Sequence, residues 1–371
     1  MMSFWGQAFL FVPNERSSHT TPTPRGGGVA IVVTFLGALI GLLWLAPDYQ
    51  AQFIALLGAG AWIALIGFMD DHGHIAARWR LLAHFTGAGW ALVWLGGLPS
   101  LTVFGVMLDL GWMGHLLALI YLVWLLNLYN FMDGIDGIAG IEAVSVCLGG
   151  AVLYGLSRSG GSEWVLPVLL LAAVAGFLFW NFPKARIFMG DAGSGFVGIV
   201  LGVLSIHAAW VAPELFWGWV ILLGAFVVDA TVTLVRRVLR GERFYEAHRS
   251  HAYQYASRKY GAHQPVSLAY GAINLFWLMP LAVLVAMGWL DGLLGVVIAY
   301  APLVWLALRF KAGHVICRSI RPTVISHGNT RKARKGLMIM IVIRLVVVGT
   351  LFGNSKSRGD GSGLTRLDLC F

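Results

Sequence analysis

Apolar residues run along this chain in long stretches, and short polar segments separate one stretch from the next. A membrane-spanning helix needs about 20 mainly apolar residues, and ten stretches approach that length. They cover residues 29–46, 51–69, 81–97, 114–129, 139–156, 164–181, 196–211, 215–235, 267–287 and 293–309. Turn-forming pairs such as Pro47-Asp48 and Asp291-Gly292 mark the breaks. The pattern predicts an all-α fold, a polytopic transmembrane helical bundle of about ten to eleven spans.

Composition supports this prediction. Hydrophobic residues make up 58% of the 371 residues and charged residues only 12%, whereas a soluble domain carries about 25% charged residues. The net charge of +9 is explained by Lys and Arg in loops that stay in the cytoplasm, and no nucleic-acid-binding motif accompanies it. The three cysteines are scattered and predict neither a disulfide framework nor a metal site.

The two ends differ from the middle of the chain. Residues 1–28 are interpreted as an N-terminal stump and cytoplasmic loop, and residues 29–311 as a transmembrane catalytic domain. Residues 312–371 combine basic patches, a short apolar run and a Gly/Ser-rich end. We interpret them as an atypical tail that is either disordered or miscalled.

Loop charges predict the orientation. When the loops up to residue 311 are assigned alternately to the two sides, one side holds all of their Lys and Arg residues except Arg158, which lies on the other. The basic side is therefore expected to be cytoplasmic. Four polar clusters fall on this same side, at residues 70–71, 127–137, 188–195 and 248–251. Carboxylates and histidines are costly near a bilayer, so their convergence predicts one active site at the cytoplasmic face.

The first two clusters supply carboxylates and amides. Asp70-Asp71 ends a span, either as a polar stop to the helix or as a carboxylate pair that positions a metal or takes a proton. Residues 127–137 read Asn-x-x-Asn-x-x-Asp-Gly-x-Asp-Gly. Residues three apart are neighbours on a helix, so Asn127, Asn130 and Asp133 form one ladder, with Asp136 just beyond it. A cap and a turn alone would not explain this repetition.

The other two clusters suit phosphate. Residues 188–195 read Phe-Met-Gly-Asp-x-Gly-Ser-Gly and predict a glycine-rich loop at a helix start, where backbone N–H groups face phosphate oxygens. Asp191 within it suits Mg²⁺, which is usually bound by one or two carboxylates plus substrate phosphates. His248 and His251 lie in an arginine-rich loop that either rests on anionic lipid or grips a diphosphate. Asp229 is an intramembrane carboxylate, which is either functional or paired with a nearby arginine.

This inventory favours phosphoryl transfer between a water-soluble donor and a lipid acceptor, chemistry that depends on positioning and charge neutralisation. The alternative is a polytopic secondary transporter with acidic coupling residues, whose site would lie near the bilayer midplane. A structural scaffold would leave the acids unexplained.

In the order and spacing of these motifs, together with residues 22–28, the chain resembles the polyprenyl-phosphate N-acetylhexosamine-1-phosphate transferases of glycosyltransferase family 4. Residues 14–19 and 248–254 are most similar to the subgroup that initiates O-antigen or related surface polysaccharides. The resemblance implies a bacterial inner-membrane enzyme with its active site facing the cytoplasm. It would transfer an N-acetylhexosamine 1-phosphate, of GlcNAc or a 6-deoxy relative, from a UDP-sugar to undecaprenyl phosphate and release UMP. The family also includes homodimers.

The resemblance also implies residue roles. Asp191 would bind Mg²⁺, with Mn²⁺ as a substitute. Asp70, Asp71, Asp133 and Asp136 form the expected catalytic set, in which the first two orient or deprotonate the lipid phosphate. The expected substrate-binding residues are Asn127, Asn130, Phe188, His248, Arg249 and His251. Among these, Phe188 would stack on uracil and the histidines would hold the diphosphate. Direct attack by the lipid phosphate is expected, because no nucleophile–base pair is evident.

Overall fold

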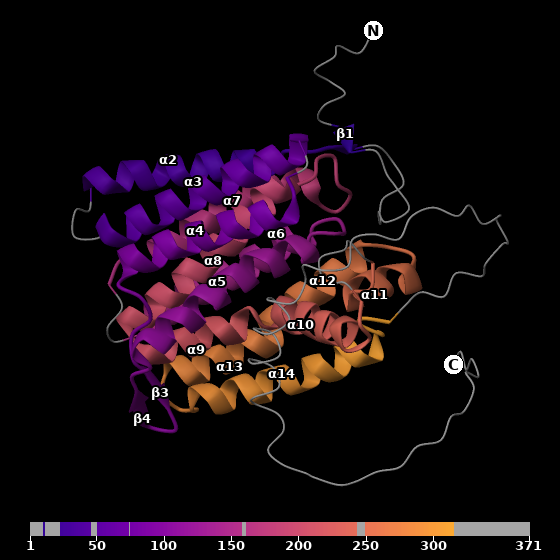
Figure 1. Cartoon of the computed structure of the whole chain (residues 1–371). Coiled ribbons are helices and arrows are strands. Elements are labelled where there is room, and N and C mark those ends of the chain that lie inside the picture. The colour runs from indigo at the N-terminus through magenta and orange to yellow at the C-terminus, as the bar shows by residue number, and fades with distance from the viewer. Residues whose placement is uncertain are drawn as a thin grey trace, which may run out of the picture. The chain divides into compact units, whose positions relative to one another are not determined.

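The computed structural model describes residues 10–11, 23–45, 50–73, 75–157, 161–242 and 249–314. In this part the chain is a bundle of helices with two short antiparallel hairpins (Figure 1). The helices are α2 (Gly28–Leu45), α3 (Gln50–Gly73), α4 (Ala77–Leu95), α5 (Gly111–Met132), α6 (Ile138–Leu156), α7 (Val165–Asn181), α8 (Gly190–Val211), α9 (Pro213–Leu222), α10 (Gly224–Leu239), α11 (Ala252–Tyr260), α12 (Gln264–Ile273), the π-helical turn η2 (Asn274–Leu278), α13 (Met279–Ala286) and α14 (Gly292–Arg309). The predicted all-α membrane fold is confirmed.

The strands were not predicted from the sequence. Strand β1 (Leu10–Phe11) pairs with β2 (Thr23–Pro24), and β3 (Leu101–Val103) pairs with β4 (Val106–Leu108). The β3–β4 turn holds two residues with positive φ, Phe104 and Gly105, as a two-residue hairpin turn requires. This hairpin lies at the opposite end of the bundle from α11 (Figure 1).

Each predicted span coincides with helical structure, with two corrections. The predicted span 215–235 is broken, because α9 and α10 meet at a 65° bend. The predicted span 196–211 begins too late, since α8 already starts at Gly190. In the described chain seven helices are long and apolar enough to cross a membrane, or eight if α9 and α10 count as one broken span. Helix α7 is apolar but shorter. The chain is a multi-pass membrane protein.

Helix α8 is the centre of the bundle, and almost every residue of its span is buried. It packs against α2, α3, α5 and α9. Glycines make this close packing possible, because a Cβ on Gly198 would lie 2.7 Å from the Leu126 Cα atom and one on Gly202 would lie 2.7 Å from the Leu122 side chain, both on α5. Small residues allow helix backbones to approach closely in membranes. This contact sets the height of α5 beside α8.

Chain direction brings the polar clusters together. Helices α3, α5 and α7 end at the same end of the bundle at which α4, α6 and α8 begin, and this end is called the site end below. The clusters at residues 70–71, 127–137 and 188–195 all lie there, whereas β3 and β4 lie at the other end (Figure 1).

Candidate active site

Asp71, at the end of α3, holds the first turn of α8. Its carboxylate accepts hydrogen bonds from the backbone N–H groups of Asp191, at 3.1 Å, and Ala192, at 3.2 Å. The first N–H groups of a helix have no partner within the helix, and their partial positive charge favours a carboxylate. Arg25 lies 3.8 Å away on the other side. Asp71 therefore fixes where the Asp191 backbone sits.

Asp70, the preceding residue, holds Arg80. Its carboxylate accepts a hydrogen bond from the Ile75 N–H at 2.6 Å and from the Arg80 guanidinium at 2.5 Å. The same Arg80 nitrogen lies 3.9 Å from the Asp191 carboxylate. Arg80 pairs with the first aspartate of the Asp70-Asp71 pair, while Arg78 lies over the Trp79 ring. Asp70 thus holds the Arg80 guanidinium near the Asp191 carboxylate.

The glycine-rich segment behaves differently from the prediction. Residues 190–195 form the first turns of α8 and are not a loop. A Cβ on Gly193 would lie 2.5 Å from the Gly28 Cα atom, and one on Gly28 would lie 2.3 Å from the Gly193 Cα atom. A Cβ on Gly67 would lie 2.5 Å from the Asp191 carbonyl oxygen. These glycines let α2, α3 and α8 meet, and the N–H groups expected to face phosphate are bound to Asp71.

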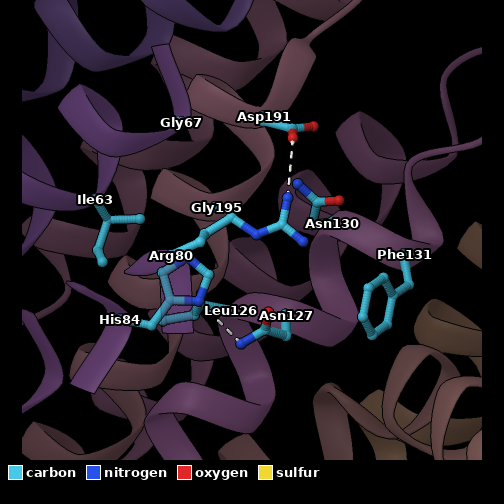
Figure 2. Close-up of a pocket in the computed structure, with 10 residues that line it drawn as sticks. All are labelled: Ile63, Gly67, Arg80, His84, Leu126, Asn127, Asn130, Phe131, Asp191 and Gly195. Atoms are coloured by element: carbon cyan, nitrogen blue, oxygen red, sulfur yellow. Dashed lines mark hydrogen bonds and ion pairs between the residues drawn. The ribbon is translucent and has the colours of Figure 1, made fainter. Parts of the chain in front are cut away.

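Two of the three residues of the predicted ladder, the asparagines, lie together on α5, and Asp133 follows the helix as its cap residue. Asn127 and Asn130 lie one turn apart near the end of this helix, and both line a small pocket with Arg80, His84 and Asp191. Figure 2 shows Asp191, the Arg80 guanidinium and the Asn130 amide converging at one level, with His84 and Asn127 below them. The free space that admits water-sized groups is about 20 Å³, room for one or two waters. The pocket as it stands can take an ion or part of a phosphate group, but not a whole nucleotide.

Asp133 follows α5 as its C-terminal cap residue and is half-buried. Within the described residues its carboxylate has no hydrogen bond or ion pair. Burial, together with the negative charges of Asp191 and Asp71, raises its pKa to about 7, and the positive charge of Arg25 opposes this shift. Carboxylates therefore crowd this part of the site.

Asp136 is held apart from that group. Its carboxylate lies 3.2 Å from the His263 Nδ1 atom, and its carbonyl oxygen accepts a hydrogen bond from Ser267 at 2.7 Å. Both partners belong to the start of α12 or the residue before it. The structure thus connects Asp136 to α12, and its predicted catalytic role stays a prediction.

Phe188 lies at the entrance to α8 and is half-buried. Its N–H donates to the Pro24 carbonyl at 2.8 Å and its carbonyl accepts from the Gly27 N–H at 2.9 Å. These bonds hold the segment that carries Arg25 beside Asp71. The stacking of Phe188 on uracil stays a prediction.

The histidine cluster is described only in part, because His248 lies outside the described residues. His251 is 2% exposed, its Nδ1 atom lies 3.6 Å from the Asp229 carboxylate, and its ring stacks near that of Phe131, with centroids 6.5 Å apart. Arg249 is partly buried nearby. In this position His251 supports Phe131, one wall of the pocket, from behind.

Asp229, on α10, anchors α11. Its carboxylate accepts hydrogen bonds from the N–H groups of Ala252, at 2.8 Å, and Tyr253, at 3.0 Å, and from the Tyr270 hydroxyl at 2.7 Å. The suggested pairing of Asp229 with Arg236 or Arg237 is wrong, since the Arg237 guanidinium bonds to Glu242. Asp229 thus accepts hydrogen bonds from the first N–H groups of α11, as Asp71 does from those of α8.

A divalent cation fits this site by its chemistry. In the described part of the chain, no three His, Cys, Asp or Glu side chains form a ready metal-binding group. Mg²⁺ does not need one, because it keeps several waters and takes one or two carboxylates plus substrate phosphates. Asp191, 36% exposed, and Asp133 are the carboxylates without backbone N–H partners to their side chains, and a cation would relieve their mutual repulsion.

Two residues of the site were not singled out from the sequence. Arg25 was read only as part of a linker motif, and its approach to Asp71 depends on β2. His84 follows Arg80 by four residues on α4, so it shares a helix face with Arg80. That spacing is a signal from which its place in the pocket could have been found.

Comparisons with known proteins agree with this geometry. A family profile described as "Glycosyl transferase family 4" matches residues 53–209, the segment that contains Asp70, Asp71, the α5 ladder and Asp191. Over these residues, which are less than half of the chain, the protein is similar to glycosyl transferase family 4.

Three relatives illustrate the similarity. A "Probable undecaprenyl-phosphate N-acetylglucosaminyl 1-phosphate transferase" of Bacillus subtilis is 29% identical over 64% of this chain and 67% of its own length. A "Decaprenyl-phosphate N-acetylglucosaminephosphotransferase" of Mycobacterium tuberculosis is 30% identical over 53% of each chain. A "Phospho-N-acetylmuramoyl-pentapeptide-transferase" of Thermotoga neapolitana is 36% identical over 50% of this chain and 60% of its own length. The chain therefore spans about half to two thirds of the relatives it matches.

Proposed function

We propose that this protein transfers an N-acetylhexosamine 1-phosphate, of GlcNAc or a 6-deoxy-N-acetylhexosamine, from a UDP-sugar to undecaprenyl phosphate, with Mg²⁺ as cofactor. UMP is the second product. The lipid-linked sugar would start a surface polysaccharide such as O-antigen. Support comes from the site and from the relatives, whose names describe an undecaprenyl-phosphate N-acetylglucosaminyl 1-phosphate transferase and a decaprenyl-phosphate N-acetylglucosaminephosphotransferase.

One observation carries the proposal. Arg80, Asn130 and Asp191, from three helices, line one pocket at the site end, and Asp70-Asp71 on a fourth helix hold Arg80 and the Asp191 backbone there. At the end of a helix bundle, a soluble donor would arrive from water and a lipid acceptor from the bilayer. A transporter site is expected near the bilayer midplane, and these acids lie at helix ends.

In the proposed reaction, an oxygen of the lipid phosphate attacks the phosphorus bonded to the sugar. A new P–O–P linkage forms, the original linkage of the UDP-sugar breaks, and UMP leaves with the bridging oxygen. Such a reaction depends on alignment and on neutralising charge. A bound Mg²⁺ would neutralise phosphate charge, held by Asp191 with Asp133 as the neighbouring carboxylate.

The remaining residues position these groups. The Asp71 carboxylate is already bound to two N–H groups and the Asp70 carboxylate to Arg80, so we assign both to positioning. Arg80 faces the phosphate charge. Asp133, whose pKa is raised to about 7, has capacity left to accept a proton, and a phosphate monoester with a second pKa near 6 needs only a weak base.

We place the site end in the cytoplasm of a bacterial inner membrane. Arg25, Arg80, Arg236, Arg249 and Lys311 lie in connections or helix ends at this end, whereas the α6–α7 connection at the other end includes Glu163. Lys and Arg concentrate in cytoplasmic loops, and UDP-sugars are cytoplasmic donors.

The experiment is a donor screen with purified protein. UDP-GlcNAc and 6-deoxy UDP-N-acetylhexosamines are each supplied with undecaprenyl phosphate, UMP is measured, and mass spectrometry identifies the lipid product. Release of UMP should require both the lipid and Mg²⁺ and stop with EDTA. Asp191→Asn should remove activity while the protein stays folded, and Glu163→Gln, at the opposite end, should not. UMP release without lipid, or with no lipid-linked sugar formed, would contradict the proposal.

A further inference from the structure

The lower level of the pocket holds a polar pair that the reaction above does not use. The Nδ2 atom of Asn127 lies 2.7 Å from the Val123 carbonyl oxygen and 3.1 Å from the Nδ1 atom of His84. His84 is 7% exposed, and both residues line the pocket with Arg80, Asn130 and Asp191 (Figure 2).

This geometry fixes which ring nitrogen carries the proton. A backbone carbonyl can only accept a hydrogen bond, so the Asn127 atom that faces Val123 must be the NH₂ group. The second hydrogen of that NH₂ group points to His84 Nδ1, which must then accept and carry no proton. A neutral imidazole with a bare Nδ1 carries its proton on Nε2. The positive charge of the nearby Arg80 guanidinium also disfavours a positively charged His84 ring.

His84 therefore brings an N–H donor to the pocket. Nδ1 is occupied by Asn127, and Nε2 has no hydrogen-bond partner among the residues the structure describes. His84 Nε2 is not one of the described chain's fully buried polar atoms without a partner, so this N–H group is open to the pocket that His84 lines and is available to a ligand atom that accepts a hydrogen bond. The pocket walls add the Arg80 guanidinium and the Asn130 amide, so an oxyanion suits it.

Depth in the bundle indicates which oxyanion. His84 lies seven residues into α4 and Asn127 five residues before the end of α5, which is about 8–10 Å from the helix ends at 1.5 Å per residue. Arg80 and Asn130 lie one turn nearer the site end. The headgroup of a lipid reaches the pocket from the bilayer, beside the helices, whereas a nucleotide reaches it from the water at the helix ends. The lower level is therefore closer to the acceptor.

We propose that His84, held as its Nε2–H tautomer by Asn127, donates a hydrogen bond to a phosphate oxygen of the polyprenyl-phosphate acceptor. This inference rests on the proposed function and names a substrate-binding residue for it. The donor diphosphate has the same oxyanion chemistry, and the experiment below separates the two sources.

Substitutions at His84 give the kinetic test. In glutamine the amide nitrogen is as many bonds from Cα as His Nε2, so His84→Gln should keep kcat/KM for the acceptor within about threefold. His84→Phe and His84→Asn, which lack a donor at that position, should lower it about 10- to 100-fold, the range for a hydrogen bond to a charged group. KM for the UDP-sugar should change less than about twofold. His207→Gln is the matched control, because His207 is equally buried on α8 and about 24 Å along the helix from Asp191.

Nitrogen NMR gives a test that does not need turnover. With ¹⁵N-histidine in bilayers, and the resonance assigned by its loss in His84→Gln, wild-type protein should show a neutral Nε2–H tautomer at pH 7.5. Farnesyl phosphate, a short analogue of the polyprenyl-phosphate acceptor, should change the chemical shift of the His84 Nε2–H proton when it is added. Asn127→Asp should convert His84 to the Nδ1–H form, because a carboxylate only accepts, and should lower acceptor kcat/KM as His84→Phe does.

Several results would overturn this inference. They are a wild-type Nδ1–H or doubly protonated ring, no shift at saturating farnesyl phosphate, equal kinetics for His84→Phe and His84→Gln, or a defect confined to KM for the UDP-sugar. Failure of the proposed function looks different, since wild-type protein would then release no UMP with any donor, while the tautomer and the farnesyl-phosphate shift could still be read.

Discussion

Asp71 and Asp191 carry the same charge and lie side by side, yet the structure gives them opposite roles, and substitution should separate them. Asp71, 6% exposed, accepts two N–H groups at the start of α8. Asp191 is 36% exposed and its nearest cation is 3.9 Å away. Asp71→Ala should therefore destabilise the fold and displace Asp191, whereas Asp191→Asn should remove activity from a stable protein.

The size of the effect follows from the contacts that Asp71→Ala removes. Loss of a helix cap costs about 0.5–2 kcal/mol, and loss of a carboxylate at a helix N-terminus adds about 0.3–1 kcal/mol. The ion pair with Arg25, 3.8 Å long with the arginine 39% exposed, adds less than about 1 kcal/mol. The expected loss of unfolding free energy is about 2–3 kcal/mol. Asp71→Asn keeps one acceptor oxygen and should lose about half of that.

The assay is unfolding in mixed micelles by SDS titration, with EDTA present so that metal binding does not contribute. Asp191→Asn should stay within about 0.5 kcal/mol of wild type, because asparagine keeps an acceptor oxygen for the Asn130 amide and the change relieves repulsion with Asp133. The reasoning is refuted if Asp71→Ala is as stable as wild type, or if Asp191→Asn is destabilised as much as Asp71→Ala.

Three further predictions concern other residues that hold the helices of the site in place or lie in it. Gly67→Ala should destabilise the protein by about 1–3 kcal/mol, because its Cβ would lie 2.5 Å from the Asp191 carbonyl oxygen; SDS titration showing no loss would contradict the α3–α8 contact. Asp133 has a folded-state pKa of about 7, above its ordinary value of 3.8, so it stabilises the fold below pH 3.8 and this stability is lost as pH rises through 7. In EDTA, wild-type unfolding free energy should therefore fall between about pH 4 and pH 7, and Asp133→Asn should reduce that fall; an unchanged slope would be the contrary result. Asp229→Asn should reduce the hydrogen-exchange protection of residues 252–260, since fewer acceptor oxygens hold α11; equal protection would argue against the anchor.

Hydrophobic patterning predicted where the helices lie, because a bilayer demands long apolar stretches whatever the tertiary packing. It could not predict the break between α9 and α10, since no proline or polar residue marks Leu223 and the 65° bend depends on packing. It also started α8 at Phe196, because Gly190, Gly193 and Gly195 have low helix propensity. In the structure Gly193 and Gly195 are helical and lie close to Gly28 and Ile63 of neighbouring helices, and Gly190 begins the helix with a φ of +77° that glycine tolerates.

The spacing of residues in the sequence predicted which residues belong to the site better than it predicted what each of them does there. The ladder of Asn127 and Asn130 follows from helical periodicity, and the pairing of Arg80 with Asp70 follows from the short connection between α3 and α4. The roles of Asp71 and Asp229 do not, because each depends on a helix start more than 20 residues away in sequence. Glu142 was passed over for a similar reason, since its hydrogen bond to Asn274 joins α6 to the π-turn η2.

The central claim is that Asp191 is the metal-binding carboxylate of one site shared by α3, α4, α5 and α8. The most direct measurement is Mn²⁺ binding followed by electron paramagnetic resonance, with UMP present, in wild type, Asp191→Asn and Glu163→Gln. Wild type and Glu163→Gln should each bind one Mn²⁺ per chain that Mg²⁺ displaces, and Asp191→Asn should bind it at least about tenfold more weakly. Equal Mn²⁺ binding by all three proteins would contradict the account.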